Sequence, residues 1–96
     1  MRSSPPGVPK TFLHRQAVAF RPVALALGRR VRALRLKREW TVEQAAEHFG
    51  IEPAHVRRIE AGRTNPSLAV LVSIARALAV PLAELVSDKS RRSRTE

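Results

Sequence analysis

Apolar residues recur along this chain every three or four positions, which is the spacing of one face of a helix. The clearest stripe joins Leu27, Val31 and Leu34, and most of the basic residues around it lie off the stripe. Pro22 stands shortly before this stripe, and proline is favoured in a first helical turn because it has no N–H to leave unsatisfied. The pattern therefore predicts a first helix from about Pro22 to about Glu39.

A second, shorter helix is predicted at about residues 41–50. Thr41 suits its N-cap, and Gln44 three residues later completes a capping box. Gly50 suits the left-handed conformation that stops a helix. The small residue Ala46 stands four positions before Gly50, so a second helix can cross closely over the glycine turn. The apolar positions are Val42, Ala45, Ala46 and Phe49.

A third helix is predicted at about residues 53–61. Pro53 opens it after Glu52, which is a weaker capping residue than Ser, Thr or Asp. Gly62 stops it. Its apolar positions are Val56 and Ile59, and Ile51 lies in the turn before it. Together with the preceding helix, this arrangement is typical of a helix-turn-helix.

Two further helices complete the pattern. Ser67 is the expected N-cap of a fourth helix, and Pro81 opens a short fifth helix. The predicted inward positions are Leu68, Leu71, Ile74, Ala75, Leu78, Leu82 and Leu85. The sequence thus predicts an all-α bundle of five helices.

The ends of the chain differ in composition from this bundle. We expect a flexible N-terminal arm at 1–21, one domain at 22–87 and a basic tail at 88–96. The pattern at 12–21 fits a strand, a helical turn or an arm, and the tail fits either a solubilising end or a nucleic-acid-binding arm. The Arg-rich, acid-free start also fits an organelle transit peptide, although its prolines oppose an amphipathic helix.

The charge of the chain indicates an anionic partner. Its 96 residues carry a formal net charge of +10, with an isoelectric point near 11.8. A charge of this sign favours nucleic acid first, an anionic membrane surface second and an acidic protein third. No apolar run approaches the roughly 20 residues that span a bilayer, so we expect no membrane partner.

Nothing in the sequence indicates catalysis. The chain has no cysteine, so disulfides and zinc–thiolate sites are excluded. Its only aspartate is Asp88, and no Ser-His-Asp set or Gly-rich phosphate loop is present. His14, His48 and His55 lack the spacing of metal ligands. We therefore expect no enzyme, no metal and no cofactor.

From about Leu27 to Val86 the chain resembles the Cro/C1-type, or XRE-family, helix-turn-helix domain, which has a lambda-repressor-like fold. The opening helix of that family is similar to LGRRVRALR, and its second helix and turn are similar to TVEQAAEHFGI. The end of its recognition helix and the following loop resemble VRRIEAGRTNPSL, and its closing helices resemble IARALAVPLAEL. This ordered set covers roughly two-thirds of the chain.

The resemblance implies a cytoplasmic, nucleoid-associated transcriptional regulator that binds double-stranded DNA as a homodimer. The recognition helix at about 53–61 would lie in the major groove of an operator. Free backbone N–H groups at the start of the second helix would bind phosphate. The implied DNA-binding residues are Thr41, Val42, Pro53, Ala54, His55, Arg57, Arg58, Arg63, Thr64 and Asn65. Whether the chain is a repressor, an antitoxin or a restriction-system controller, and whether a toxin or a polymerase binds it, stays open.

Several residues depart from the family pattern. Val42 stands where the family often has Gln, and Pro53 and Ala54 replace polar readers, so they can contact a thymine methyl but cannot read hydrogen-bond patterns. Glu52 adds a negative charge near the phosphates. Specificity would then rest on His55, Arg57 and above all Arg58, since arginine can donate two hydrogen bonds to guanine. These departures favour one alternative: an adaptor or coactivator that binds protein or RNA.

The resemblance also implies structural roles. Arg35 and Glu60 match an ion pair that ties the first helix to the end of the third. Trp40 is expected at the corner between the first and second helices, and His48 in solvent. The candidate dimer surface comprises Val70, Val72, Val80 and Val86.

Overall fold

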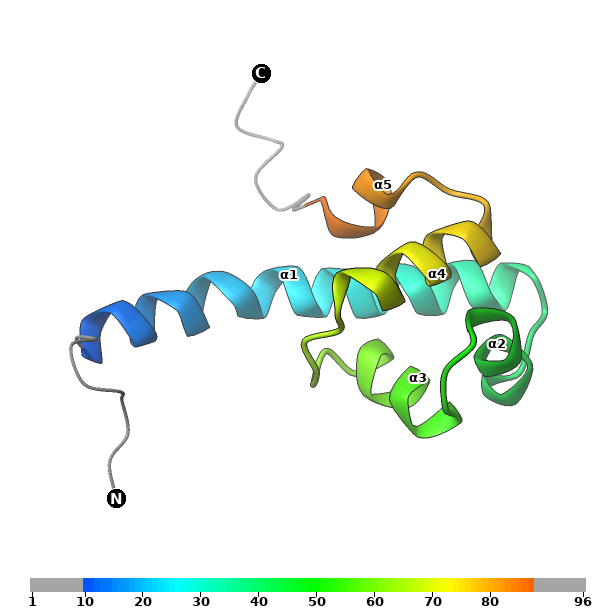
Figure 1. The fold of residues 1–96 in the computed structure, drawn as a ribbon, viewed down its shortest axis with the longest axis horizontal. Helices are drawn as coiled ribbons and strands as arrows, with labels where there is room; N and C mark the ends of the chain where they lie inside the picture. The colour runs from blue at the N-terminus through cyan, green and yellow to red at the C-terminus, as the bar shows by residue number, and fades with distance from the viewer. Residues whose placement is uncertain (1–9, 88–96) are drawn as a thin grey trace.

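The computed structural model describes the backbone of residues 10–87 and the side chains of residues 18–87. This part of the chain forms five helices and no strand, which confirms the predicted all-α class. The helices are α1 (Lys10–Lys37), α2 (Val42–Phe49), α3 (Pro53–Glu60), α4 (Leu68–Leu78) and α5 (Leu82–Val86). Figure 1 shows α1 running along the molecule, with α2 and α3 on one side of it and α5 on the other.

The predicted start of the first helix is wrong. α1 begins at Lys10 rather than near Pro22, which lies inside the helix. A proline within a helix removes one backbone hydrogen bond and crowds the preceding turn, which is why the residue suggested a boundary. The expected flexible arm at 1–21 is thus helical from Lys10, while residues 1–9 and the tail at 88–96 lie outside the described residues.

The ends of the short helices follow the sequence closely. At α2, Thr41 Oγ1 accepts from the Gln44 N–H and Gln44 Oε1 accepts from the Thr41 N–H, which completes the predicted capping box. Gly50 ends α2 with a φ of 75°. Glu52 precedes α3 without a side-chain cap, and Ser67 Oγ caps α4 by accepting from the Val70 N–H. These local hydrogen bonds fix where α2 begins and ends and where α4 begins.

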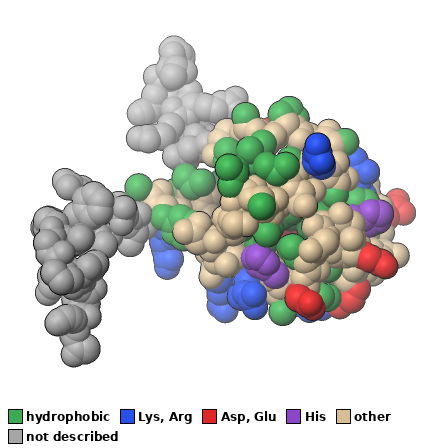
Figure 2. Space-filling view, in the orientation of Figure 1, with side chains coloured by type: hydrophobic (Ala, Val, Ile, Leu, Met, Phe, Trp, Pro, Cys, Tyr) green, Lys and Arg blue, Asp and Glu red, His purple; other side chains and the backbone are tan. Residues whose placement is uncertain are grey.

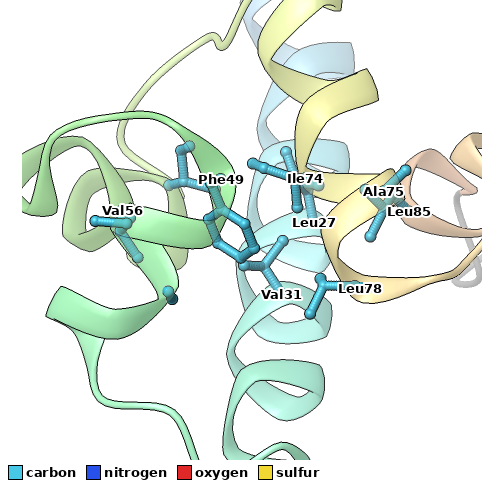
Figure 3. Packing of buried hydrophobic residues seen from close by; sticks show 11 residues of the cluster. Leu27, Val31, Phe49, Val56, Ile74, Ala75, Leu78 and Leu85 are labelled. Carbon is cyan, nitrogen blue, oxygen red and sulfur yellow. The ribbon is translucent and has the colours of Figure 1, made fainter.

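The core is aliphatic, apart from one aromatic ring. Figure 3 shows Leu27 and Val31 of α1 lying between Phe49 on one side and Leu78 and Leu85 on the other. Burying each such side chain stabilises the fold by about 1.5–3 kcal/mol. The buried cluster is Leu27, Val31, Ala45, Ala46, Phe49, Val56, Ile59, Ile74, Ala75, Leu78 and Leu85.

One predicted core residue is not in the core. Leu68 was expected in the α4 stripe, but it is 66% exposed. It is the first residue of α4, one turn before the helix meets the rest of the bundle at Leu71 and Ile74. Periodicity assigned Leu68 to the right helical face but could not show that this face has no neighbour at the helix start.

Gly28 allows a close approach between α1 and α3. A Cβ atom at this position would lie 2.5 Å from the carbonyl oxygen of Ile59 and 2.6 Å from that of Glu60. No real Cβ packs so near an oxygen, so only glycine lets α1 cross the last turn of α3 at this distance. The sequence analysis did not single out this glycine.

We expect Gly28→Ala to destabilise the protein. Inside a helix, replacing Gly by Ala ordinarily stabilises by about 0.5–1 kcal/mol. Here the added methyl group must push α3 away, and such overpacking typically costs about 1–3 kcal/mol. Thermal unfolding followed by circular dichroism measures the difference, with Ala33→Gly on the exposed face of α1 as the control for helix propensity. A melting temperature at or above that of the wild type would contradict the close contact.

Arg35 forms the predicted ion pair with Glu60. Its Nε donates to Oε2 at 2.6 Å and its Nη2 donates to Oε1 at 3.0 Å, so the pair is bidentate. Nη1 donates to the Trp40 carbonyl oxygen at 2.9 Å. Both side chains are only 9% exposed. The hydrogen bond to Glu60 raises the pKa of Arg35 in spite of its burial, so the guanidinium stays charged. One side chain thereby links α1, the corner before α2 and the end of α3.

Arg35→Ala should lower the melting temperature sharply. Removing one member of a buried pair leaves the other charge uncompensated, which costs about 3–5 kcal/mol. Differential scanning calorimetry measures the loss, and Arg32→Ala removes an exposed arginine from the same helix as a matched control. If the two variants unfold at the same temperature, the pair does not hold the fold together.

Candidate nucleic-acid interface

The turn between α2 and α3 sets the direction of α3. The N–H groups of Gly50 and Ile51 both donate to the Ala46 carbonyl oxygen, at 2.8 and 3.1 Å, which closes the end of α2. α3 starts at Pro53, after only three residues. Val56 and Ile59 then face the core, so the opposite side of α3 is presented to solvent.

The exposed face of α3 carries few polar groups. Ala54, Arg57 and Arg58 are exposed, while Pro53 is half-buried at the start of the helix. Ala54 and Arg58 lie one turn apart, so they share a side of the helix. A methyl group beside a guanidinium can contact a thymine methyl and a guanine edge, respectively.

His55 does not lie squarely on this face. It is half-buried and lines a shallow depression together with Ala46, Gly50, Ile51 and the acidic residues Glu47 and Glu52. Because two carboxylates border this depression, it is a poor site for a phosphate or a base edge. The structure thus separates His55 from the two arginines that the sequence placed beside it.

Arg57 already has a partner on α2. Its Nη2 donates to Glu43 Oε2 at 2.7 Å, and both side chains are largely exposed. The hydrogen bond from Arg57 lowers the pKa of Glu43, so the carboxylate is charged near neutral pH. The sequence analysis did not identify Glu43, although its place in the first turn of α2 is a signal that could have drawn attention to it.

The loop after α3 lies against α1. Gly62 has a φ of 70°, and a Cβ there would lie 2.7 Å from Leu25 Cδ2. The Arg63 N–H donates to the Arg58 carbonyl oxygen at 2.9 Å, so the loop starts directly at the C-terminal end of α3. Arg63 and Asn65 are exposed and Thr64 is half-buried.

The start of α2 differs from the expectation in one respect. The Thr41 N–H was expected to be free for an anion, but it donates to Gln44 Oε1 at 2.9 Å. Satisfying this N–H is the function of a capping box. Thr41 itself remains exposed, whereas Val42 is half-buried and packs against the core.

Arg30 of α1 and Arg38 in the turn after α1 each make a tertiary hydrogen bond, although Arg38 is also exposed. Arg30 Nη1 donates to the Leu85 carbonyl oxygen at 2.6 Å, and Arg38 Nη2 donates to the Leu78 carbonyl oxygen at 3.0 Å. Each binds a carbonyl in the last turn of a helix, where positive charge is favoured. These contacts join α1 to α5, and the turn after α1 to α4.

Trp40 lies at the predicted corner. Its ring stacks on His48 with centroids 4.0 Å apart and meets Phe49 edge-on at 6.3 Å. The guanidinium of Arg38 lies 5.3 Å from the ring centroid. His48 is exposed as expected, but its ring covers the indole. Packing therefore accounts for Trp40.

Charge and apolar groups occupy different parts of the surface. Figure 2 shows Lys and Arg side chains at the lower left and upper right, Asp and Glu side chains mainly at the lower right, and hydrophobic side chains gathered over α4 and α5. Across the described residues, no group of three or more acidic or histidine side chains could hold a metal ion. Among the helices that the structure describes, none is both long and apolar enough to cross a bilayer.

Known proteins share this arrangement. A family model described as a helix-turn-helix domain matches residues 26–87. The immunity repressor protein of Bacillus phage phi105 is 32% identical over 66 residues, which are 69% of this chain and 46% of that protein. This chain thus matches less than half the length of that repressor.

Two solved structures have the same fold. The restriction-modification controller protein C.AhdI from Aeromonas hydrophila is 31% identical with a TM-score of 0.62, covering 65% of this chain and 94% of that one. The clp gene regulator ClgR from Corynebacterium glutamicum is 26% identical with a TM-score of 0.64, covering 71% of this chain and 72% of that one. The resemblance inferred from the sequence is confirmed.

Proposed function

We propose that this chain, which belongs to the helix-turn-helix domain family, is a DNA-binding transcriptional regulator. The observation that carries the proposal is the exposed face of α3, which a tight glycine turn and a buried ion pair hold away from the core. A helix presented in this way fits the major groove, which is wide enough to admit it. The similar proteins are a repressor and two regulators, so they do not favour the adaptor alternative.

Sequence readout is assigned to the centre of this face. Arg58 is the proposed base reader, because an exposed guanidinium can donate two hydrogen bonds to guanine O6 and N7. Ala54 lies one turn before it and would contact a thymine methyl. Pro53 and Arg57 lie beside these two and are proposed as secondary contacts, whereas His55 faces the depression that Glu47 and Glu52 border and is not assigned a contact.

Phosphate contacts are assigned to both sides of α3. Arg63, Thr64 and Asn65 would bind one strand, since their loop begins at the C-terminal end of α3. Thr41 and Val42 at the start of α2 would bind near a second phosphate, where the positive end of the helix dipole favours an anion. These contacts position the protein on DNA without choosing a sequence.

The regulator is proposed to act as a homodimer in the cytoplasm, associated with the nucleoid. Val72 of α4 and Val86 of α5 are 38% and 36% exposed. Val70 and Val80 are half-buried beside them. A pair of reading helices one turn of DNA apart would recognise an operator with two-fold symmetry.

Arg58→Ala should weaken binding to a DNA site selected from a random pool by about 1–3 kcal/mol, and relax the preference at one base position. Loss of a bidentate contact to guanine explains both effects. Fluorescence anisotropy with duplexes that carry each base at that position measures them. Arg76→Ala, which removes an exposed arginine from α4, is the control. An equal loss on every sequence would instead identify Arg58 as a phosphate contact.

Arg63→Ala should weaken binding equally on selected and unrelated duplexes. It should also reduce the slope of log K against log salt by about one, because one fewer counterion is released. The slope comes from a titration series over several salt concentrations. A loss confined to the selected site would mean that Arg63 reads sequence, which the proposed division of roles does not allow.

A further inference from the structure

Glu43 and Arg57 form an ion pair on the surface that is proposed to face DNA. Arg57 Nη2 lies 2.7 Å from Glu43 Oε2, and the side chains are 57% and 64% exposed, respectively. The pair joins the first turn of α2 to the exposed face of α3. Neither helix needs it for its position, because the capping box and the buried core fix both. Stability therefore does not account for the Glu43–Arg57 pair.

The pair places a carboxylate where DNA phosphates are expected. Glu43 follows Thr41 and Val42, the proposed phosphate contacts at the start of α2. Its charge repels a phosphate and at the same time holds a guanidinium that would otherwise bind one. Arg57 keeps further N–H donors that Glu43 does not use, since a guanidinium has five. Those donors stay available to a base edge.

We propose that Glu43 is a specificity-determining positioning residue, which holds Arg57 on the reading face and withholds it from DNA phosphates. This inference rests on the proposed DNA-binding function. It gives the regulator a way to limit sequence-independent binding, which a chain with a net charge of +10 would otherwise favour strongly. With Pro53 and Ala54 at the helix start, Arg57 and the proposed base reader Arg58 are the exposed side chains of this face that can read hydrogen-bond patterns.

The expected effect is modest, because the pair is exposed. An exposed ion pair contributes a factor of about five at most to an equilibrium. Replacing the carboxylate also removes one repulsive charge near the phosphates. Glu43→Gln should therefore bind random-sequence DNA about threefold to tenfold more tightly at low salt. Once Arg57 is free to neutralise a phosphate, the salt slope should steepen by about 0.9.

The experiment measures dissociation constants by fluorescence anisotropy on a random-sequence duplex and on a selected duplex, over a series of salt concentrations. Glu43→Gln should show the steeper slope on random DNA and a lower ratio of selected to random affinity. Arg57→Gln alone should leave the slope on random DNA unchanged. Adding Glu43→Gln to Arg57→Gln should not steepen it, because the arginine that would bind the phosphate is absent.

Glu47→Gln is the matched control, since it removes an equal charge from the exposed side of α2 four residues later. It should leave both the slope and the ratio as in the wild type. A Glu43→Gln variant with wild-type slope and ratio would overturn the inference and leave the proposed function standing. The inference would also be overturned if adding Glu43→Gln to Arg57→Gln steepened the salt slope on random DNA. Failure of the wild type to bind either duplex would instead contradict the proposed function, and the inference with it.

Discussion

The buried pair between Arg35 and Glu60 is the contact on which the rest of the structure depends. It ties the last turn of α1 to the last residue of α3, and the same guanidinium donates to the Trp40 carbonyl before α2 begins. Gly28 lies two turns before Arg35 on α1. It brings the backbones of α1 and α3 together, because glycine has no side chain to separate it from the carbonyls at the end of α3. An eight-residue helix has little stability of its own, so these contacts decide where α3 points.

The exposed face of α3 is held at both ends of the helix and carries few polar side chains between them. The glycine turn fixes the start of α3, and the ion pair fixes its end. Between them lie an alanine and two arginines, of which one is already paired with Glu43. A face of this kind can bind DNA through charge while reading few bases, and its discrimination then depends on how each arginine is held.

Features set by neighbours in the sequence could be predicted, and features set by distant contacts could not. The caps at Thr41 and Ser67 and the turn at Gly50 involve residues no more than four apart, so their residue types suffice. The extension of α1 past Pro22, the exposure of Leu68 and the role of Gly28 depend on what packs nearby in three dimensions. Periodicity identifies a helical face but not its neighbour.

The same distinction between local and distant contacts applies to the candidate nucleic-acid interface. The family resemblance placed the third helix and the Arg35–Glu60 pair correctly, because both accompany a recognisable order of motifs. It did not separate Arg57 from Arg58, since the partner of Arg57 lies 14 positions away on another helix. Nor did it show that Arg30 and Arg38 bind carbonyls at the ends of α5 and α4 rather than solvent.

Selection of DNA ligands from a random pool tests the central claim most directly, which is that α3 is held by these contacts as a DNA-reading helix. The account predicts enrichment of a short motif with guanine at a fixed position, repeated with two-fold symmetry about one helical turn, or 10–10.5 base pairs, apart. A bound pool with the same sequence composition as the starting pool would contradict it.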